Sequence, residues 1–365
     1  MVEEFIYRQP VKIWFGAGEL SKLPDVLSEL GITRCVLVCD RFLAGRAEQL
    51  QAALPEIRAV FSDVEANPQL SGVEDVVTLE RETKSDGVIG LGGGSTLDTA
   101  KFAAAIAKAP GEAIEYFRGK RAFPAAGLPI VTIPTTAGTG SEVTQVSVVS
   151  HGREKKTINQ PVFMPKAAIV DPTLTLSVPP RTTMNTGLDA LAHALEGYWS
   201  RNHQPISDLL AIEAVRLVLE NLEAAFQDGN NLEARTNMSL AALLGGLSFA
   251  LPKTAGSHAC SYPLSEDYHL PHGEACAFTL DSFVRINADA RLELLCQRTG
   301  MRKTDYLADK IQYFKELAGL RTRLSDLGEV DLDKLCRDCA AHPLMQNNPV
   351  VMDEDRLRRM FEALR

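Results

Sequence analysis

An aspartate and a histidine four residues apart are the first pair whose types and spacing point to chemistry. Asp189 and His193 lie in the segment 187–196, whose other residues are largely leucine and alanine. On a helix this spacing places both side chains on one face, and the flanking leucines predict that the helix is buried. A buried aspartate and histidine need partners, which either a metal ion or a hydrogen bond between the two side chains would supply.

Three more histidines, His258, His269 and His272, lie close together later in the chain. The sequence predicts that His258 ends a long helical segment and that His272 starts the next element, so that two helix ends converge on one point. An aspartate with two or three histidines forms a mixed oxygen and nitrogen metal site with room for a substrate oxygen. The residues alone leave a metal site and a structural cluster both open.

A run of glycines could bind a diphosphate. The run Gly92–Ser95 follows a strand-like segment, 86–91, and opens a helical one, 96–101. Glycines at such a turn let backbone N–H groups approach a diphosphate, and the helix N-terminus adds a favourable dipole. The alternative is a tight turn without a ligand, because the run lacks the full dinucleotide fingerprint.

Two further polar sites follow strand-like segments. Asp40 comes directly after the apolar run 35–39, and the loop 134–142, rich in hydroxyls and glycine, follows the run 129–134. A carboxylate at a strand end can accept from the 2′-hydroxyl of an adenosine ribose and repels a 2′-phosphate, although it could equally cap a helix. The loop could bind phosphate or the nicotinamide end of a cofactor, or be an irregular turn. Parallel sheets bind ligands at the carboxyl ends of their strands.

The elements that must position these residues change in kind along the chain. The first half alternates the strand-like runs above with helical ones, for example 20–30 and 73–83, which indicates a parallel α/β sheet. After Pro179 the pattern is helical, with long periodic segments at 209–226, 233–251 and 305–317. We therefore predict an α/β domain at 1–178 and an all-α domain at 179–365, with a ligand cleft between them.

The overall composition narrows the classes of function. A chain of 365 residues with a formal net charge of −9 suits two globular domains and argues against binding to nucleic acid. The N-terminal residues lack an apolar signal segment, and the longest uncharged apolar stretch, 236–252, is shorter than the ~20 residues of a membrane span. Seven scattered cysteines suit a reducing compartment, so we expect a cytoplasmic protein without membrane contact.

Together these motifs resemble the iron-containing (group III) alcohol dehydrogenases over nearly the whole chain. The resemblance rests on the glycine run, on the loop 134–142, and on Asp171-Pro172, 187–196 and 271–273. It implies a dehydroquinate synthase-like fold, with an α/β dinucleotide-binding domain followed by an all-helical metal-binding domain. It also implies a metal-dependent, NAD(P)H-linked alcohol dehydrogenase or aldehyde reductase that acts on a small alcohol or aldehyde. We expect a homodimer or a higher homo-oligomer.

The resemblance assigns roles to individual residues. The metal, Fe(II) or Zn(II), would be bound by Asp189, His193, His258 and His272. NAD(H), preferred over NADP(H) because of the acidic ribose contact, would be bound by Asp40, Gly92, Gly93, Gly94, Ser95, Asp98, Thr135, Thr136 and Thr144.

The sequence departs from the family pattern at one position near the reacting groups. Many members carry a second histidine four residues after the position of His258, where this chain has Tyr262. A proton relay through that histidine is therefore in doubt, although a tyrosine hydroxyl could donate or pass a proton. The alternative is a tyrosine that only packs.

The segment 253–264 resembles the phosphonoacetaldehyde reductase branch of the family, which would convert phosphonoacetaldehyde to 2-hydroxyethylphosphonate. Lys253, shortly before a metal ligand, could supply positive charge for a phosphonate. The alternative is a lysine that faces solvent at a helix C-terminus.

Other functions remain as alternatives. The nearest is a generic primary-alcohol or 1,3-propanediol-type dehydrogenase. A lyase of the dehydroquinate synthase type and a non-catalytic nucleotide-binding or metal-binding protein are further alternatives, which the loop 134–142 and the four-ligand pattern disfavour.

Overall fold

The computed structural model describes residues 4–152 and 154–364, which form two compact units. An α/β unit comprises Arg8–Thr136 and Ser141–Thr175, and a helical unit comprises residues 4–7, Ala137–Gly140 and 176–364. The short segment Ala137–Gly140, inside the second polar loop, thus belongs to the helical unit.

The α/β unit is built on a six-stranded sheet in which every neighbouring pair is parallel. Across the sheet the order is β1 (Lys12–Phe15), β8 (Ala167–Val170), β5 (Ile130–Pro134), β4 (Gly87–Gly92), β2 (Cys35–Cys39) and β3 (Ile57–Phe61). The predicted parallel α/β architecture is confirmed, and the predicted strand at 35–39 has the bounds of β2.

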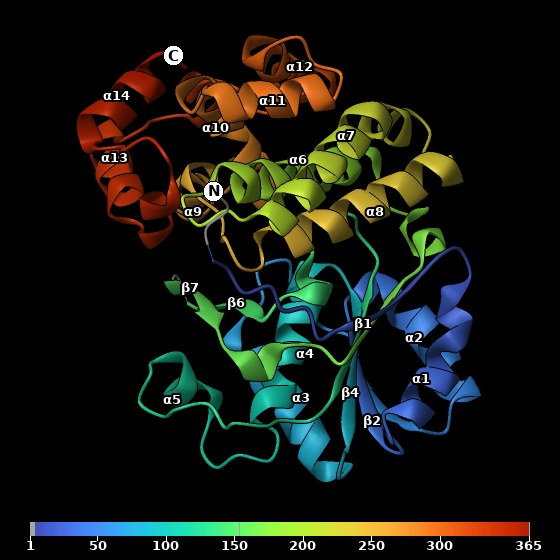
Figure 1. Ribbon diagram of the computed structural model, residues 1–365. Helices are drawn as coiled ribbons and strands as arrows, with labels where there is room; N and C mark the ends of the chain where they lie inside the picture. The colour runs from blue at the N-terminus through green and yellow to red at the C-terminus, as the bar shows by residue number, and fades with distance from the viewer. Residues whose placement is uncertain (1–3, 153, 365) are drawn as a thin grey trace. The chain divides into compact units, whose positions relative to one another are not determined.

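Helices cover both faces of this sheet because its strands are buried on both faces. Val36 and Val38 of β2 face a core shared with α3 (Leu70–Glu82) and α4 (Gly94–Ile106). The alternate residues of β2 face a second core, which they share with α1 (Leu23–Glu29) and α2 (Ala44–Ala53). Figure 1 shows these two helix pairs on opposite sides of the strands.

The three central strands bring the polar loops of this unit together. β5, β4 and β2 are consecutive neighbours, with Gly92 opposite Pro134 and Leu91 opposite Cys39. The loops that begin at Asp40, Gly93 and Thr135 therefore leave the same edge of the sheet side by side.

The α/β unit also contains elements that the sequence pattern did not predict. An antiparallel hairpin, β6 (Val146–His151) and β7 (Glu154–Asn159), follows the second polar loop, and a short helix, α5 (Ala113–Phe117), precedes β5. Seven 3₁₀ turns lie in the two units, at Glu19–Lys22, Arg41–Leu43, Ser141–Val143, Pro161–Phe163, Pro172–Thr175, Leu324–Leu327 and Pro343–Asn347.

Outside these turns, the helical unit consists of α-helices that pack around one hydrophobic core (Figure 1). They are α6 (Pro180–Trp199), α7 (Pro205–Gln227), α8 (Leu232–Phe249), α9 (Gly256–Tyr268), α10 (His272–Ile286), α11 (Ala290–Arg298), α12 (Thr304–Leu317), α13 (Leu332–Ala341) and α14 (Glu354–Glu362). The predicted all-helical character of the second half is confirmed. Within the described part of the chain, every helix is too short or too polar to cross a membrane.

The predicted position of His258 at the end of a long helix is wrong. Helix α8 ends at Phe249, and His258 lies in the first turn of a separate helix, α9. Pro263 lies inside α9. Because prolines are typical of helix ends, the sequence pattern did not predict this helix.

Candidate metal centre and cofactor loops

One buried face of α6 carries three residues of the candidate metal centre. Asp189, His193 and Glu196 are 2%, 6% and 0% exposed and lie three and four residues apart. Pro180 occupies the first turn of α6, where its missing N–H costs nothing, and leucines and alanines surround Asp189 and His193 between residues 188 and 195. The predicted helix with both Asp189 and His193 on one face is confirmed.

The starts of two other helices meet this face. His258 lies in the first turn of α9, and His272 is the first residue of α10, where Pro271 is the N-cap. A Cβ on the next residue, Gly273, would lie 2.1 Å from the backbone oxygen of Asn185 in α6. Glycine is therefore required for the close approach that brings His272 to α6.

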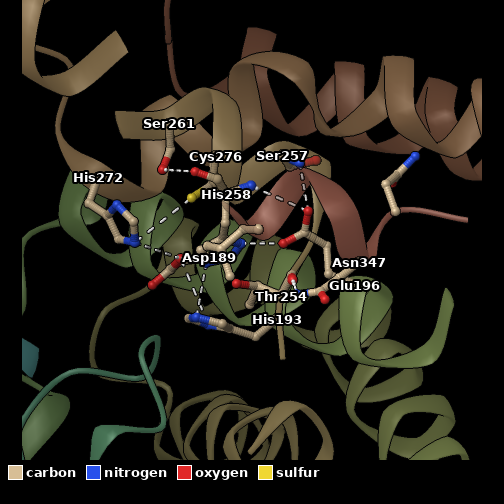
Figure 2. A network of polar contacts seen from close by, with 12 residues as sticks. Asp189, His193, Glu196, Thr254, Ser257, His258, Ser261, His272, Cys276 and Asn347 are labelled. Atoms are coloured by element: carbon tan, nitrogen blue, oxygen red, sulfur yellow. Dashed lines mark hydrogen bonds and ion pairs between the residues drawn. The ribbon is translucent and has the colours of Figure 1, made fainter. Parts of the chain in front are cut away.

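The four predicted ligand side chains converge on one point (Figure 2). Oδ1 of Asp189 lies 3.6 Å from Nε2 of His258, 3.8 Å from Nε2 of His272 and 3.8 Å from Nδ1 of His193. Nε2 of His258 also lies 3.0 Å from Nε2 of His193. The helices thus bring together residues that are up to 83 positions apart in the sequence.

One oxygen of the carboxylate at the centre of the cluster has no hydrogen-bond donor among the described residues. Among the described residues, Oδ1 of Asp189 is buried and accepts no hydrogen bond. A buried carboxylate oxygen without a donor is costly unless a cation binds it. One oxygen and three imidazoles form a donor set that suits Fe(II) or Zn(II), so the residues present fit a divalent metal.

The charge states of two ligands also suit a metal. Burial alone would raise the pKa of Asp189, but the three histidines around it lower that pKa below its ordinary value, so this carboxylate is ionised. Burial lowers the pKa of His193 to about 4, which leaves its imidazole neutral near pH 7. A carboxylate and a neutral imidazole are the forms in which these side chains bind metals.

Glu196 orients His258 within the centre. Its Oε1 accepts from the backbone N–H groups of Ser257 and His258, at 2.6 and 3.3 Å, and its Oε2 lies against Nδ1 of His258. A hydrogen bond from Nδ1–H to Glu196 leaves the lone pair of His258 on Nε2, the atom nearest to Asp189. The sequence motif included Glu196, but nothing in its spacing indicated this role.

A fifth donor lies beside the predicted ligands. Sγ of Cys276, a buried residue of α10, lies 3.8 Å from Nε2 of His272 (Figure 2). One ligand atom each from Asp189, His258, His272 and Cys276 all lie within 4.8 Å of one another. Sequence reasoning missed Cys276, although it follows His272 by four residues, the same helical spacing that singled out Asp189 and His193.

The glycine run forms the turn from β4 into α4 at the sheet edge. A Cβ at Gly92 would lie 2.5 Å from Oγ1 of Thr96, so only glycine fits there. The second polar loop is adjacent, because the N–H of Thr135 donates to the backbone oxygen of Gly92 at 3.0 Å. The N-terminus of α4 and the threonine loop thus form one surface on which a diphosphate could be bound.

A buried cluster of charged and hydroxyl side chains holds the loop 134–142 in place. Asp98 accepts from Oγ of Ser141 at 2.6 Å and from the N–H of Val148 at 2.9 Å. Nζ of Lys101, which is fully buried, donates to Ser141 and contacts Thr144 at 3.4 Å. The carboxylate of Asp98 and the hydroxyl of Thr144 therefore have partners within the protein, and both residues support the loop.

Asp40 lies where the sequence predicts, at the carboxyl end of β2. Its Oδ1 accepts from the N–H of Phe42 at 2.9 Å, so it is also an N-cap, the second role that the sequence left open. This bond uses one of its two carboxylate oxygens. A cap of this kind holds the carboxylate at the edge of the sheet beside the glycine run.

Three other residues considered in the sequence lie close to the ligands along the chain but outside the cluster of described ligand atoms. Tyr262, one turn after His258 on α9, stacks on His342 with ring centroids 4.3 Å apart. Lys253 is exposed just after the C-terminus of α8, and its N–H donates to Phe249. His269 is the exposed C-cap of α9 in the left-handed conformation, and it is absent from the cluster of described ligand atoms.

Comparison with known proteins extends this description. The family described as "Iron-containing alcohol dehydrogenase" matches residues 10–172, and its C-terminal counterpart, "Fe-containing alcohol dehydrogenase family, C-terminal", matches residues 183–364. The chain is 35% identical to long-chain-alcohol dehydrogenase 1 of Geobacillus thermodenitrificans over 95% of this chain and 93% of that one.

Solved structures that are similar to this protein also cover nearly the whole chain. The chain is similar to sulfoacetaldehyde reductase from Bifidobacterium kashiwanohense in complex with NAD+, with 39% identity, a TM-score of 0.95 and 99% of each chain covered. It is also similar to a 1,3-propanediol oxidoreductase, with 30% identity, a TM-score of 0.90 and 100% of each chain covered.

Proposed function

The chain belongs to the iron-containing alcohol dehydrogenase family, and from this premise we propose that it is an NADH-dependent reductase of short aldehydes that carry an anionic group. Family membership makes it an oxidoreductase that acts on alcohols and aldehydes with a nicotinamide cofactor and a metal. The preferred cofactor, the metal and the substrate are our proposals.

One observation supports the metal dependence. Oδ1 of Asp189 is buried, has no hydrogen-bond donor among the described residues and lies within 3.8 Å of three imidazoles. A divalent metal bound there supplies Lewis acidity to an aldehyde oxygen. The side chain of His272 is 36% exposed, whereas those of Asp189, His193 and His258 are at most 7% exposed. A substrate oxygen would therefore approach on the side of His272.

Bound NADH supplies the hydride. We propose that the glycine run and the N-terminus of α4 bind its diphosphate, because their backbone leaves no side chain in the way. Thr135 and Thr136 follow β5 beside this turn and would add hydrogen bonds. Ser95 would contribute its backbone N–H, because its hydroxyl donates to the backbone oxygen of Ala66 at 2.6 Å. Asp98 and Thr144 would act indirectly, by holding the loop.

The first prediction concerns Asp40 and the choice of cofactor. A carboxylate that faces a 2′-phosphate repels it and loses a hydrogen bond to the ribose, so we expect wild type to favour NADH over NADPH by about 10- to 100-fold in kcat/KM. Asp40→Gly should remove most of this preference. Asp25→Ala, at an exposed carboxylate of α1 in the same unit, is the control. A wild type that favours NADPH would overturn the proposed contact.

The second prediction concerns Tyr262, which we propose assists proton delivery to the alkoxide. Its place one turn beyond His258 puts it on the same face of α9. Tyr262→Phe should lower kcat by about 10²-fold, a low value for general acid catalysis, without loss of metal. Tyr306→Phe, at an exposed tyrosine, is the control. Equal kinetics for wild type and Tyr262→Phe across the pH range would favour a packing role over proton delivery.

We propose a two-carbon aldehyde with a phosphonate or sulfonate group as the substrate. The resemblance of segment 253–264 favours phosphonoacetaldehyde, and the similar structure from Bifidobacterium is a sulfoacetaldehyde reductase. Lys253 is the proposed cation: it shortly precedes α9, which carries His258, and its left-handed backbone, φ 66°, ends the turn after α8. A fixed charge of this kind recognises a tetrahedral anion.

The third prediction tests this substrate class by NADH oxidation. We expect kcat/KM for phosphonoacetaldehyde or sulfoacetaldehyde to exceed that for propanal by about 10- to 100-fold, which corresponds to one charge-assisted hydrogen bond. Lys253→Ala should erase much of the difference, and Lys303→Ala, at an exposed lysine of the same unit, should not. Equal or better activity on propanal would indicate a generic primary-alcohol or 1,3-propanediol-type dehydrogenase, the alternative that the second similar structure favours.

We also propose a cytoplasmic homo-oligomer, a dimer or larger. All seven cysteines are free and buried thiols, which suits a reducing compartment. On α7, Ile206 and Leu209 are 38% and 62% exposed and lie three residues apart on one helix face, which suits an interface between copies. Light scattering coupled to size-exclusion chromatography measures the mass, and a monomer would contradict this proposal.

A further inference from the structure

Cys276 faces the same point as three of the four residues assigned to the metal. Nε2 of His258 and Nε2 of His272 both lie next to Oδ1 of Asp189, at 3.6 and 3.8 Å, and Sγ of Cys276 lies 3.8 Å from that same Nε2 of His272. Ligand atoms around a tetrahedral zinc, with bonds of ~2.0–2.3 Å, lie roughly 3.3–3.6 Å apart. All four donor atoms lie within 4.8 Å of one another, so a bound ion would draw them together by about 1 Å or less.

His193 is placed differently. Its Nδ1 is the nitrogen beside Asp189, at 3.8 Å, whereas its Nε2 is the nitrogen beside His258, at 3.0 Å. A histidine binds a metal ion through one of its two nitrogens. In His193 the nitrogen beside Asp189 is not the nitrogen beside His258, so no single nitrogen of this ring lies next to both residues. Its ring also stacks on Phe249, with centroids 4.3 Å apart and planes 15° apart, which fixes the plane of the ring.

We propose that Cys276 is a metal ligand, and that Zn(II) or Co(II) is bound by Asp189, His258, His272 and Cys276, with the thiolate in the place of His193. On binding, the S–H bond breaks, an S–metal bond forms and the proton leaves to solvent, without a change of oxidation state. Soft thiolate donors suit zinc and cobalt, whereas Fe(II) is served by the nitrogen and oxygen donors that include His193. The proposal rests on the metal dependence proposed above.

The consequence is a protein whose ligand set depends on the ion. With Zn(II) the site contains one sulfur, two nitrogens and one oxygen, and with Fe(II) it contains three nitrogens and one oxygen. The two sets share Asp189, His258 and His272. Nε2 of each of these histidines lies within 3.8 Å of Oδ1 of Asp189. Residue 276 would thus favour zinc over iron at this site.

The first test is the absorption spectrum of the Co(II)-loaded protein, prepared without oxygen. We expect wild type to show a thiolate-to-cobalt charge-transfer band in the near ultraviolet, and Cys276→Ala to lack it. Cys296→Ala, at a buried cysteine of α11, should keep the band. A Co(II)-loaded wild type without this band overturns the proposal, whatever the variants do.

The second test is equilibrium dialysis with Zn(II) and with Fe(II). We expect Cys276→Ala to weaken Zn(II) binding by about 10- to 100-fold and to leave Fe(II) binding close to that of wild type. His193→Ala should show the reverse, with Zn(II) retained and Fe(II) lost. Loss of both metals only in His193→Ala would refute the role of Cys276. Retention of both metals in His272→Ala would instead refute the shared metal centre.

Discussion

Replacing His272 with alanine is expected to abolish stoichiometric binding of a divalent metal and to lower kcat/KM for aldehyde reduction by at least ~10³-fold. The reason is geometric. Nε2 of His272 lies 3.8 Å from both Oδ1 of Asp189 and Sγ of Cys276, so it is common to both proposed ligand sets. Its loss leaves the buried carboxylate of Asp189 with fewer partners, whichever ion is supplied.

Elemental analysis after reconstitution with Fe(II) or Zn(II) measures this effect directly. His258→Ala should behave in the same way, because its Nε2 is the nitrogen nearest to Asp189. His151→Ala, at an exposed histidine of the β6–β7 hairpin, should retain one metal per chain. Unchanged metal content in His272→Ala and His258→Ala would show that the cluster is structural.

Glu196→Gln is expected to weaken metal binding by about 10- to 100-fold and to lower kcat/KM with it, although Glu196 is not a predicted ligand. The glutamine oxygen can still accept from the backbone N–H groups of Ser257 and His258. Its amide, however, would donate to Nδ1 of His258 where the carboxylate accepts. That reversal moves the proton to Nε2, the nitrogen that the metal needs.

Metal titration of Glu196→Gln separates this positioning role from a simple loss of stability. We expect activity to recover at high metal concentration, because the ligands themselves are unchanged. Glu213→Gln, at a partly exposed glutamate paired with Arg216 on α7, serves as the control and should bind metal like wild type. If Glu196→Gln bound metal with wild-type affinity, its carboxylate would only cap α9.

The periodic patterns of the sequence predicted most of the fold. Continuous apolar runs gave strands such as β2 at the expected residues, because buried parallel strands need no polar alternation. The hairpin β6–β7 escaped prediction, since its second strand, Glu154–Asn159, is polar and partly exposed. Helix α9 was also missed, because Pro263 and the small residues before it resemble a loop.

The site was predicted in part, for a similar reason. Asp189 and His193 are one helical turn apart, so local spacing alone places them together. The convergence of His258 and His272 on them followed from the family resemblance, since contacts between α6, α9 and α10 are set by tertiary packing. The partners of buried groups, such as Glu196 on His258 and Lys101 on Ser141, have no local signal and became visible only in the structure.

The most direct test of a metal-dependent anionic-aldehyde reductase is NADH oxidation by one preparation before and after removal of metal. We expect no turnover of phosphonoacetaldehyde or sulfoacetaldehyde by protein stripped with a chelator, and recovery on addition of one equivalent of Fe(II) or Zn(II) per chain. Undiminished NADH oxidation by the stripped protein would contradict metal dependence. Absence of turnover with both aldehydes in the reconstituted protein, with propanal reduced instead, would contradict the anionic substrate.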